Sequence, residues 1–459
     1  MKNISFIGRR QELALIKKLQ SKNFLLVVKG RRRIGKTTLL TKAFPDAAYI
    51  FIWPNKSPRW MIERICADHK LPTFNTFTDI LSCLLDQKKV IIIDEFQNFL
   101  QVDSSVYGEI QKLIDERKIN KTFLKLAVSG SSYSLIQKVL SDVASPLYGR
   151  RDAEITLSHL PIPALFQELQ MPLREFIELW SVFEGIPYYY ELIDTTLTAQ
   201  ENIQHLILAK NASLQNEGKT LLAVEFGKDS KTYSTIFSAI AEGKTKLQEI
   251  SSLFDGKSNE VIKYLDLLRN EFKLVQRATP LLADPRKSKE GHYLIIDNFL
   301  HFWFHFIDKQ RDYIEQERFK EVQNFFNANF NAFVGRKFEK FILQLLNSGI
   351  ITLRNEDKMG SQWGSIPGAS KDKNQYEIDI CAINEKKKEL LLGECKWEER
   401  VDARMIIAEL QQKASYLPWH QFDRKEYYAL FAKSFKTKIS KEGVYLYDLQ
   451  DIKRALQRP

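Results

Sequence analysis

A glycine- and arginine-rich loop directly behind an apolar segment constrains the fold more than any other feature of the chain. Residues 24–28 are all apolar, and the pattern G-x-x-x-x-G-K-T follows with Gly30, Gly35, Lys36 and Thr37. The apolar run predicts a buried strand, and the helical run behind the loop supplies a helix N-terminus that favours anions. In this pattern backbone N–H groups wrap phosphates, the lysine reaches the β/γ oxygens and the hydroxyl binds Mg²⁺. The sequence therefore predicts a nucleotide site.

A second motif supports this interpretation. Residues 90–93 are β-branched and apolar, and the carboxylates of Asp94 and Glu95 stand at their C-terminal end. In P-loop proteins the first carboxylate holds Mg²⁺, directly or through water, and the second polarises the attacking water. We therefore expect ATP and Mg²⁺ as cofactors, Lys36 and Glu95 as catalytic residues, and Thr37 and Asp94 as metal ligands. The loop residues expected to bind nucleotide are Gly30, Arg31, Arg32, Arg33, Ile34, Gly35, Lys36, Thr37 and Thr38.

The pattern around these motifs predicts the architecture. Apolar runs at residues 24–28, 90–93 and 124–128 alternate with helical stretches up to about residue 225. This alternation predicts an α/β fold with a parallel sheet and helices on both faces. A chain of 459 residues has room for about three domains at roughly 100–200 residues each.

Further motifs resemble those of AAA+ and STAND ATPases. Residues 6–13 look like the motif that packs near the adenine, residues 129–132 look like the sensor-1 position, and residues 185–187 look like the lid motif that contacts adenine. Their order resembles the archaeal-type ATPase family, which also occurs in bacteria, over residues 1 to about 195. The resemblance implies an AAA+/STAND ATPase domain with a helical lid at residues 1–225, and it adds Ser129 and Pro187 to the nucleotide site.

Arg150 and Arg151 follow the sensor region and are candidates for an arginine finger. An arginine that reaches a γ-phosphate stabilises the charge that develops there. The alternative, surface arginines behind a loop, stays open. So does the question whether a finger acts within one chain or from a neighbouring copy, which would make a homo-oligomer.

Charge and cysteine content bear on partners and compartment. The formal net charge of +11 favours an anionic partner such as DNA, RNA or nucleotide, with a solvated basic surface as the alternative. The four cysteines form no CxxC pair, which indicates neither a zinc site nor a disulfide framework. The polar first residues are unlike a secretory signal, and the apolar runs are too short to cross a bilayer. We expect a soluble cytoplasmic protein without a membrane partner.

The middle of the chain resembles a winged helix at residues 226–295. Three helices are expected at residues 232–242, 247–254 and 259–271, followed by apolar runs at 272–275 and 293–296. Between these runs lies a basic turn with Arg286, Lys287 and Lys289. A third helix in the major groove and a wing on phosphate would bind DNA. The near-neutral charge of the region favours the alternative of a packing module that relays the ATPase state.

Residues 296–334 are expected to form an aromatic helical connector. Five phenylalanine and tryptophan residues fall within residues 299–306. Bases could stack on such rings, but buried core is the more common use of a dense aromatic run.

The last region, residues 335–459, shows a second α/β pattern. Residues 377–383 and 390–397 read as two strands of a hairpin around a charged turn. Alternation along a strand projects Glu394 and Lys396 from the same face, and Asp379 lies on the partner strand. Charges on such apolar strands need compensation, and a divalent cation between Asp379 and Glu394 would supply it. Residues 355–375 are expected to be a loop.

The arrangement resembles the PD-(D/E)XK nuclease core. Asp379, Glu394 and Lys396 match its motif, and Glu339 matches the glutamate of its first helix, although the proline of the motif is absent. The resemblance implies a restriction-endonuclease-like fold, with Glu339, Asp379, Glu394 and Lys396 as catalytic residues converging on one cation held by Asp379 and Glu394. Two functions follow as hypotheses: an ATPase coupled to a metal-dependent nuclease, or an ATP-dependent switch or DNA-binding regulator whose nuclease-like domain is silent.

Overall fold

The protein is described here from a computed structural model, which places all residues except 1–5, 132–135, 137–138, 141, 144, 255–257, 289, 355, 367, 370–373 and 458–459. Two compact units make up the chain. The amino-terminal unit consists of Asn3–Pro161 and Ile186–Glu191, and the carboxy-terminal unit contains Ile162–Gly185 and Leu192–Pro459.

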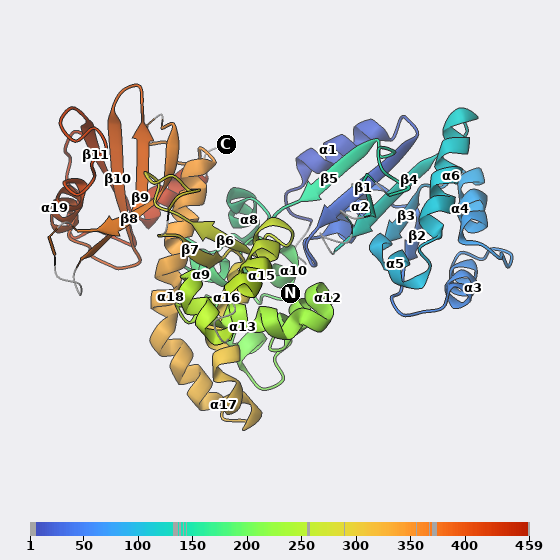
Figure 1. The fold of residues 1–459 in the computed structure, drawn as a ribbon, viewed down its shortest axis with the longest axis horizontal. Coiled ribbons are helices and arrows are strands. Elements are labelled where there is room, and N and C mark those ends of the chain that lie inside the picture. The colour runs from blue at the N-terminus through green and yellow to red at the C-terminus, as the bar shows by residue number, and fades with distance from the viewer. Residues whose placement is uncertain are drawn as a thin grey trace. The chain divides into compact units, whose positions relative to one another are not determined.

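The amino-terminal unit is built on a parallel five-stranded sheet in the order β2-β3-β4-β1-β5. The strands are β1 (Phe24–Gly30), β2 (Ala48–Phe51), β3 (Ile91–Asp94), β4 (Lys125–Gly130) and β5 (Ala153–Leu157). The helices that accompany them include α1 (Arg10–Leu19), α2 (Lys36–Ala43), α3 (Pro58–Asp68), α4 (Phe77–Asp86), α6 (Val106–Ile119) and α10 (Pro187–Glu191). Figure 1 shows this sheet with its helices. The predicted parallel α/β fold is confirmed.

Burial explains why the central strands β1 and β3 could be predicted from their apolar sequences. Every residue of β1 and of β3 is buried. Strands covered on both faces are largely apolar, since neither face meets water, and the charged exceptions in these two strands are Lys29 and Asp94. The core that covers one face of the sheet includes Leu25, Ile50, Ile93 and Leu126.

The first part of the carboxy-terminal unit is helical. Its helices are α8 (Ile162–Leu169), α9 (Leu173–Phe183), α11 (Ala199–Ile203), α12 (Glu217–Phe226), α13 (Ser230–Ala241), α14 (Leu247–Ser251), α15 (Ser258–Asn270), α16 (Asn298–Phe306), α17 (Arg311–Glu315) and α18 (Phe319–Asn347). The aromatic side chains of α16 are buried, among them Phe299, Phe302, Trp303, Phe304 and Phe306. Because the rings are buried, they form core and are not available for stacking on bases.

The region expected to resemble a winged helix has the elements in the expected order. Helices α13, α14 and α15 are followed by an antiparallel pair, β6 (Val275–Ala278) and β7 (His292–Ile295). The first strand begins three residues later than expected, because Leu274 and the residues before it close the end of α15 instead. The loop between β6 and β7 contacts the last sheet: Leu281 N donates to Ser361 O at 3.0 Å, and Trp363 Nε1 donates to Glu290 O at 3.1 Å.

A mixed five-stranded sheet, in the order β12-β11-β10-β9-β8, forms the end of the chain. Its strands are β8 (Lys358–Ser365), β9 (Gln375–Asn384), β10 (Glu389–Lys396), β11 (Lys425–Ala432) and β12 (Val444–Tyr447), with helices α19 (Ala403–Ala414) and α20 (Leu449–Leu456). The expected hairpin is β9 and β10, which pair antiparallel. The expected loop at residues 355–375 is wrong in part, because β8 lies within it; this edge strand is half polar and carries Gly360 and Gly364, so no apolar alternation marked it.

The division of the chain also differs from the one expected. The helices of residues 162–185 and 192–225 belong to the carboxy-terminal unit instead of forming a lid with the sheet, and only residues 186–191 return to the amino-terminal unit. The expected boundary between residues 334 and 335 falls inside α18, the long helix drawn in orange in Figure 1. The compact units divide the chain differently from the domains expected, because helices pack through apolar faces that loop composition does not reveal.

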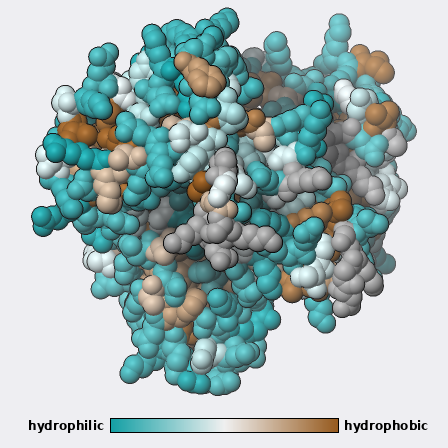
Figure 2. All heavy atoms as spheres, turned by 60° about the vertical axis from the view of Figure 1, so that its left-hand side comes forward, coloured by the Kyte–Doolittle hydropathy of each residue, from teal (hydrophilic) through white to brown (hydrophobic). Residues whose placement is uncertain are grey.

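Among the described residues, no helix is long and apolar enough to cross a membrane. Apart from its grey atoms, the face drawn in Figure 2 is mostly hydrophilic, and its hydrophobic residues lie in small scattered groups.

Candidate functional site

The phosphate-binding loop has the backbone geometry that its glycines predict. An added Cβ on Gly30 would lie 2.9 Å from the carbonyl oxygen of Leu157, so this position tolerates no side chain. Gly35 has φ of 89°, in the left-handed region that favours glycine, and it caps the N-terminus of α2. The loop therefore leads from buried strand β1 straight to a helix N-terminus, where backbone N–H groups attract anions.

Lys36 is buried at the start of α2. Its ammonium group donates to the carbonyl oxygens of Gly30 at 2.9 Å and Arg31 at 3.0 Å. The charge thus lies against the loop that was predicted to hold the phosphates. Of the other loop residues, Ile34 is buried, Arg31 and Arg33 are half-buried, and Arg32 and Thr38 are exposed.

Asp94 is the centre of a hydrogen-bond cluster. Its Oδ2 accepts from Thr37 Oγ1 at 2.6 Å and from the Tyr49 hydroxyl at 2.9 Å. Its Oδ1 accepts from Glu95 N at 3.0 Å and from Ser129 Oγ, the residue matched to sensor-1. Thr37 and Asp94 thus present hard oxygen donors side by side, which is the donor chemistry that Mg²⁺ prefers. These two residues would hold the ion.

Tyr49 is a site residue that the sequence analysis missed. Burial, together with the charge of Asp94 and its hydrogen bond to that carboxylate, raises the pKa of Tyr49. The side chain lies on β2, the edge strand next to β3. No motif marks it, because its contact with Asp94 arises only from the pairing of the two strands.

The two motifs expected near the adenine do contact the phosphate-binding loop. Arg9 donates to Ile34 O at 3.2 Å and to Ser158 O at 2.6 Å. From α10, the Tyr188 ring lies 4.0 Å from the Arg33 guanidinium carbon. The nearest atom to an added Cβ on Gly35 is a ring carbon of Pro187, at 3.9 Å. Both segments therefore border the loop.

Arg150 and Arg151 are held within their own unit. Arg150 forms a two-pronged ion pair with Asp115, with Nη2 at 2.9 Å from Oδ2. Arg151 pairs with Glu154 at 3.2 Å and donates to Leu140 O at 3.1 Å. These contacts favour the structural interpretation of both arginines. Of the residues matched to sensor-1, Ser132 lies outside the described residues.

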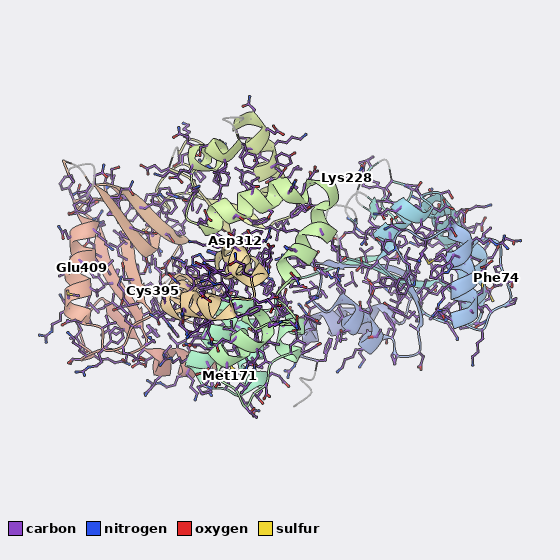
Figure 3. All side chains as sticks on the ribbon, turned by 90° about the horizontal axis from the view of Figure 1, so that it is seen from below. Phe74, Met171, Lys228, Asp312, Cys395 and Glu409 are labelled. Atoms are coloured by element: carbon purple, nitrogen blue, oxygen red, sulfur yellow. The ribbon has the colours of Figure 1, made fainter. Side chains whose placement is uncertain are left out.

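A second candidate site lies in the carboxy-terminal unit, where β9, β10, α18 and α19 surround a cavity of about 520 Å³. The pairing of β9 with β10 ends at Ile380 and Gly393, so Asp379 and Glu394 are the next residues on the two strands. The backbone N–H of Cys395 donates to Asp379 Oδ2 at 2.8 Å. Figure 3 labels Cys395 on β10 and Glu409 on α19. The lining comprises Glu339, Ile366, Gln375, Tyr376, Glu377, Asp379, Glu394, Cys395, Lys396, Glu409, Gln412, Lys413 and Tyr416.

Two carboxyl groups in this cavity, those of Glu339 and Asp379, are destabilised as anions. Burial raises the pKa of Glu339 well above its usual value, and the charges of Asp379, Glu377 and Glu394 add to the effect. Burial and the charge of Glu394 likewise raise the pKa of Asp379. Carboxylates placed this close repel one another unless a cation neutralises them.

Two lysines supply part of that neutralisation. Glu394 accepts from Lys396 Nζ at 2.8 Å and from Lys413 Nζ at 3.1 Å. Lys396 was predicted to point to the same spot as Glu394, and the two side chains do lie in contact, although no three-ligand cation site forms in the part of the chain that the structure describes. Lys413, on α19, was missed because helix α19 lies distant in sequence from the hairpin.

The expected convergence of three carboxylates on one cation is not formed. Among the described residues, no three His, Cys, Asp or Glu side chains are spaced to hold one metal ion. The physical reason is pairing: both oxygens of Glu394 bind ammonium groups, and one oxygen of Asp379 binds the backbone of β10. The donors suit a hard cation chemically, but their arrangement does not suit it in this structure.

Two family models match parts of the chain, and the first agrees with the amino-terminal assignment. Residues 22–165 match a family described as an AAA domain, and residues 303–406 match one described as archaeal and bacterial proteins of unknown function. The Walker-type ATPase paby2304 of Pyrococcus abyssi is 16% identical, with a TM-score of 0.48, over 65% of this chain and 96% of that one. The ORC2 protein of Aeropyrum pernix, in ADPNP–ADP complexes, is 13% identical, with a TM-score of 0.40, over 72% of this chain and 98% of that one.

The parallel sheet, the loop around Lys36 and the Asp94 cluster fit the AAA domain that residues 22–165 match. The uncharacterized protein MJECL04 of Methanocaldococcus jannaschii is 30% identical over 456 residues, which cover 97% of this chain and 99% of that protein. The chain belongs to the same family as MJECL04.

Proposed function

We propose that the protein hydrolyses ATP at the amino-terminal site and uses its carboxy-terminal cavity to cleave phosphodiester bonds of DNA or RNA. The observation that carries the nuclease part is the grouping of Glu339, Asp379, Glu394 and Lys396 around one cavity. The net charge of +11 supports an anionic polymer as partner.

At the nucleotide site, each residue has a role that follows from its chemistry. Lys36 and the backbone N–H groups of the loop bind the phosphates, and Thr37 and Asp94 would hold Mg²⁺, which would supply neutralisation of charge on the β/γ oxygens. Glu95 accepts the proton of the attacking water. Ser129 orients Asp94 through its hydrogen bond.

At the second site, Asp379 and Glu394 would hold a divalent cation once their present contacts are rearranged, and the cation would supply polarisation of the scissile phosphate. For this Glu394 must release at least one of its lysines. Lys396, once released, binds the phosphate or steadies the attacking water. Glu339 borders the cavity from α18, and a cation in the cavity would stabilise its anionic form.

Lys36→Ala should weaken ATP binding by at least tenfold, because it removes the charge next to the phosphates. Glu95→Gln should keep ATP binding and lose most hydrolysis. Fluorescent-nucleotide titration and phosphate release measure the two effects. Lys42→Ala, an exposed lysine on the same helix, is the control and should change neither. Unaltered ATP binding by Lys36→Ala contradicts the site.

For the cavity, purified protein should cut DNA or RNA only with Mg²⁺ or Mn²⁺, and cutting should vanish in Asp379→Ala and Lys396→Ala. Gel analysis of labelled single- and double-stranded substrates, with and without ATP, measures this. Glu385→Ala and Lys386→Ala, exposed on the turn of the same hairpin, are matched controls that should cut normally. Cutting that persists in both cavity variants marks a contaminant and contradicts the assignment.

A second function, an ATP-dependent switch of the STAND type with a silent nuclease-like domain, is favoured by one observation. Both oxygens of Glu394 are paired with lysines, and no three-ligand cluster exists among the described residues. If the parent protein binds Mn²⁺ only at the site of Thr37 and Asp94, and cuts no substrate in any nucleotide state, the switch is the better account.

A further inference from the structure

The two serines of the segment Ser129-Gly130-Ser131 bind the carboxylate pair at the end of β3. Ser129 donates to Asp94, and Ser131 Oγ donates to Glu95 Oε2 at 2.7 Å. Gly130, between them, has no room for a side chain, since an added Cβ would lie 2.4 Å from Gln97 Oε1. The glycine therefore leaves space for Gln97 beside the catalytic glutamate.

Gln97 is buried, with 4% of its surface exposed. Its Nε2 donates to Glu95 Oε2 at 2.5 Å, the same oxygen that Ser131 binds. A carboxylate oxygen can only accept, so the amide must present its nitrogen to Glu95. Its oxygen is buried and has no hydrogen-bond partner among the described residues, a costly arrangement unless another molecule binds there.

The two donors bind only one of the two carboxylate oxygens of Glu95. Oε2 receives both hydrogen bonds, whereas the described residues supply neither a hydrogen bond nor an ion pair to Oε1. Glu95 also has φ of 55°, a left-handed conformation that is uncommon for a residue with a side chain. Such conformations persist where surrounding contacts enforce them.

We propose that Gln97 and Ser131 are positioning residues for ATP hydrolysis, which hold one carboxylate oxygen of Glu95 so that the other accepts the proton of the attacking water. In this step the water oxygen bonds to the γ-phosphorus and the water proton passes to Glu95 Oε1. The bond between that phosphorus and the β–γ bridging oxygen breaks, and its electron pair leaves on ADP. The inference rests on the role proposed above for Glu95.

The test compares Gln97→Met and Ser131→Ala with the parent. Methionine keeps the length and volume of glutamine but cannot donate. Since fixing a catalytic base contributes through orientation, we expect kcat for ATP to fall about tenfold or more in each variant. KM and nucleotide affinity should stay within about twofold, because neither residue was placed on the phosphates. Ser131→Thr keeps the hydroxyl and should retain most of the activity that Ser131→Ala loses.

Matched controls lie in the carboxy-terminal unit. Gln310→Met and Ser181→Ala remove the same groups from buried residues far from the site in sequence, and kcat should not change. The effects of Gln97→Met and Ser131→Ala should be less than additive when combined, since both act through one carboxylate.

Three outcomes overturn the inference. The first is kcat within twofold of the parent in both variants while Glu95→Gln is inactive; Glu95 then acts without these donors. The second is a fall in melting temperature and nucleotide affinity that parallels the fall in kcat, which marks a purely structural role. The third is full hydrolysis by Glu95→Gln, which removes the proposed role of Glu95 and the inference with it.

Discussion

Buried polar side chains outside the two sites show how single residues constrain this fold. Lys337 on α18 is buried, and its Nζ lies 2.8 Å from His301 Nδ1 on α16. Three residues further along α18, Lys340 pairs with buried Glu184 at 2.6 Å and donates to Ile296 O at 2.7 Å. Lys340 has a carboxylate partner, whereas Lys337 contacts an imidazole whose pKa burial lowers well below its usual value.

The environment of Lys337 predicts a pH dependence of stability. Burial, with the charges of Lys340 and Arg336, lowers the pKa of Lys337 to about 7, against the raising effect of Glu184 and Asp297. In the unfolded chain a lysine keeps its proton up to about pH 10.4. Between these values the unfolded state binds one more proton, so stability should rise with pH, by up to about 1.4 kcal/mol per pH unit.

Denaturant unfolding of the parent and of Lys337→Met at pH 7, 8, 9 and 10 measures this contribution. The difference in unfolding free energy between the two should grow in favour of the parent as the pH rises. Lys320→Met, an exposed lysine on the same helix, should follow the parent at every pH. A constant difference between the parent and Lys337→Met would mean that the lysine is protonated in the folded protein.

At the scale of elements, two helical glycines should respond oppositely to alanine. An added Cβ on Gly218 in α12 would lie 2.2 Å from the Trp303 ring, which is buried and donates to Gln215 O. Overpacking of this kind costs about 1–3 kcal/mol and should outweigh the gain of about 0.5–1 kcal/mol from helix propensity. On Gly335 in α18 the nearest atom is 3.7 Å away, an ordinary contact.

Calorimetry should therefore show a lower melting temperature for Gly218→Ala and a slightly higher one for Gly335→Ala. Both glycines lie in the carboxy-terminal unit, so the same transition reports both. A stabilised Gly218→Ala variant would show that α12 can shift away from α16 at little cost.

Elements with a clear apolar pattern or a complete sequence motif could be predicted. Elements and side chains whose role depends on residues elsewhere in the fold could not. Strands β1 and β3 and the loop around Lys36 are contiguous, so their chemistry is readable from one stretch of sequence. Strand β8 is half polar, and its strand character comes from pairing with β9. In the sites, Tyr49 and Lys413 act through tertiary contacts with Asp94 and Glu394, which spacing along the chain cannot reveal.

At the scale of the molecule, the two compact units agree only in part with the domains expected from the sequence. The segment Ile186–Glu191 belongs to the amino-terminal unit although the helices on either side of it belong to the other. Pro187 and Tyr188, at the loop around Lys36, are therefore joined covalently to Glu184, which is paired with Lys340 on α18. No composition change marks this crossing, so a linear division of the chain could not have found it.

The continuity of α18 also limits how such a chain can recombine in evolution. Its first half buries Val322, Phe326 and Phe330, and its second half buries Phe341 and Ile342 beside the turn that carries Glu339. Recombination with a related gene at residue 335 would join two half-helices that come from different proteins. The side chains of the two halves would then not have evolved to face compatible directions around the helix axis. A mismatch of one residue turns every following side chain by about 100°, which would move Glu339 away from the cavity. Viable exchanges should therefore have their junctions before Phe319, so that the whole helix is inherited with the domain.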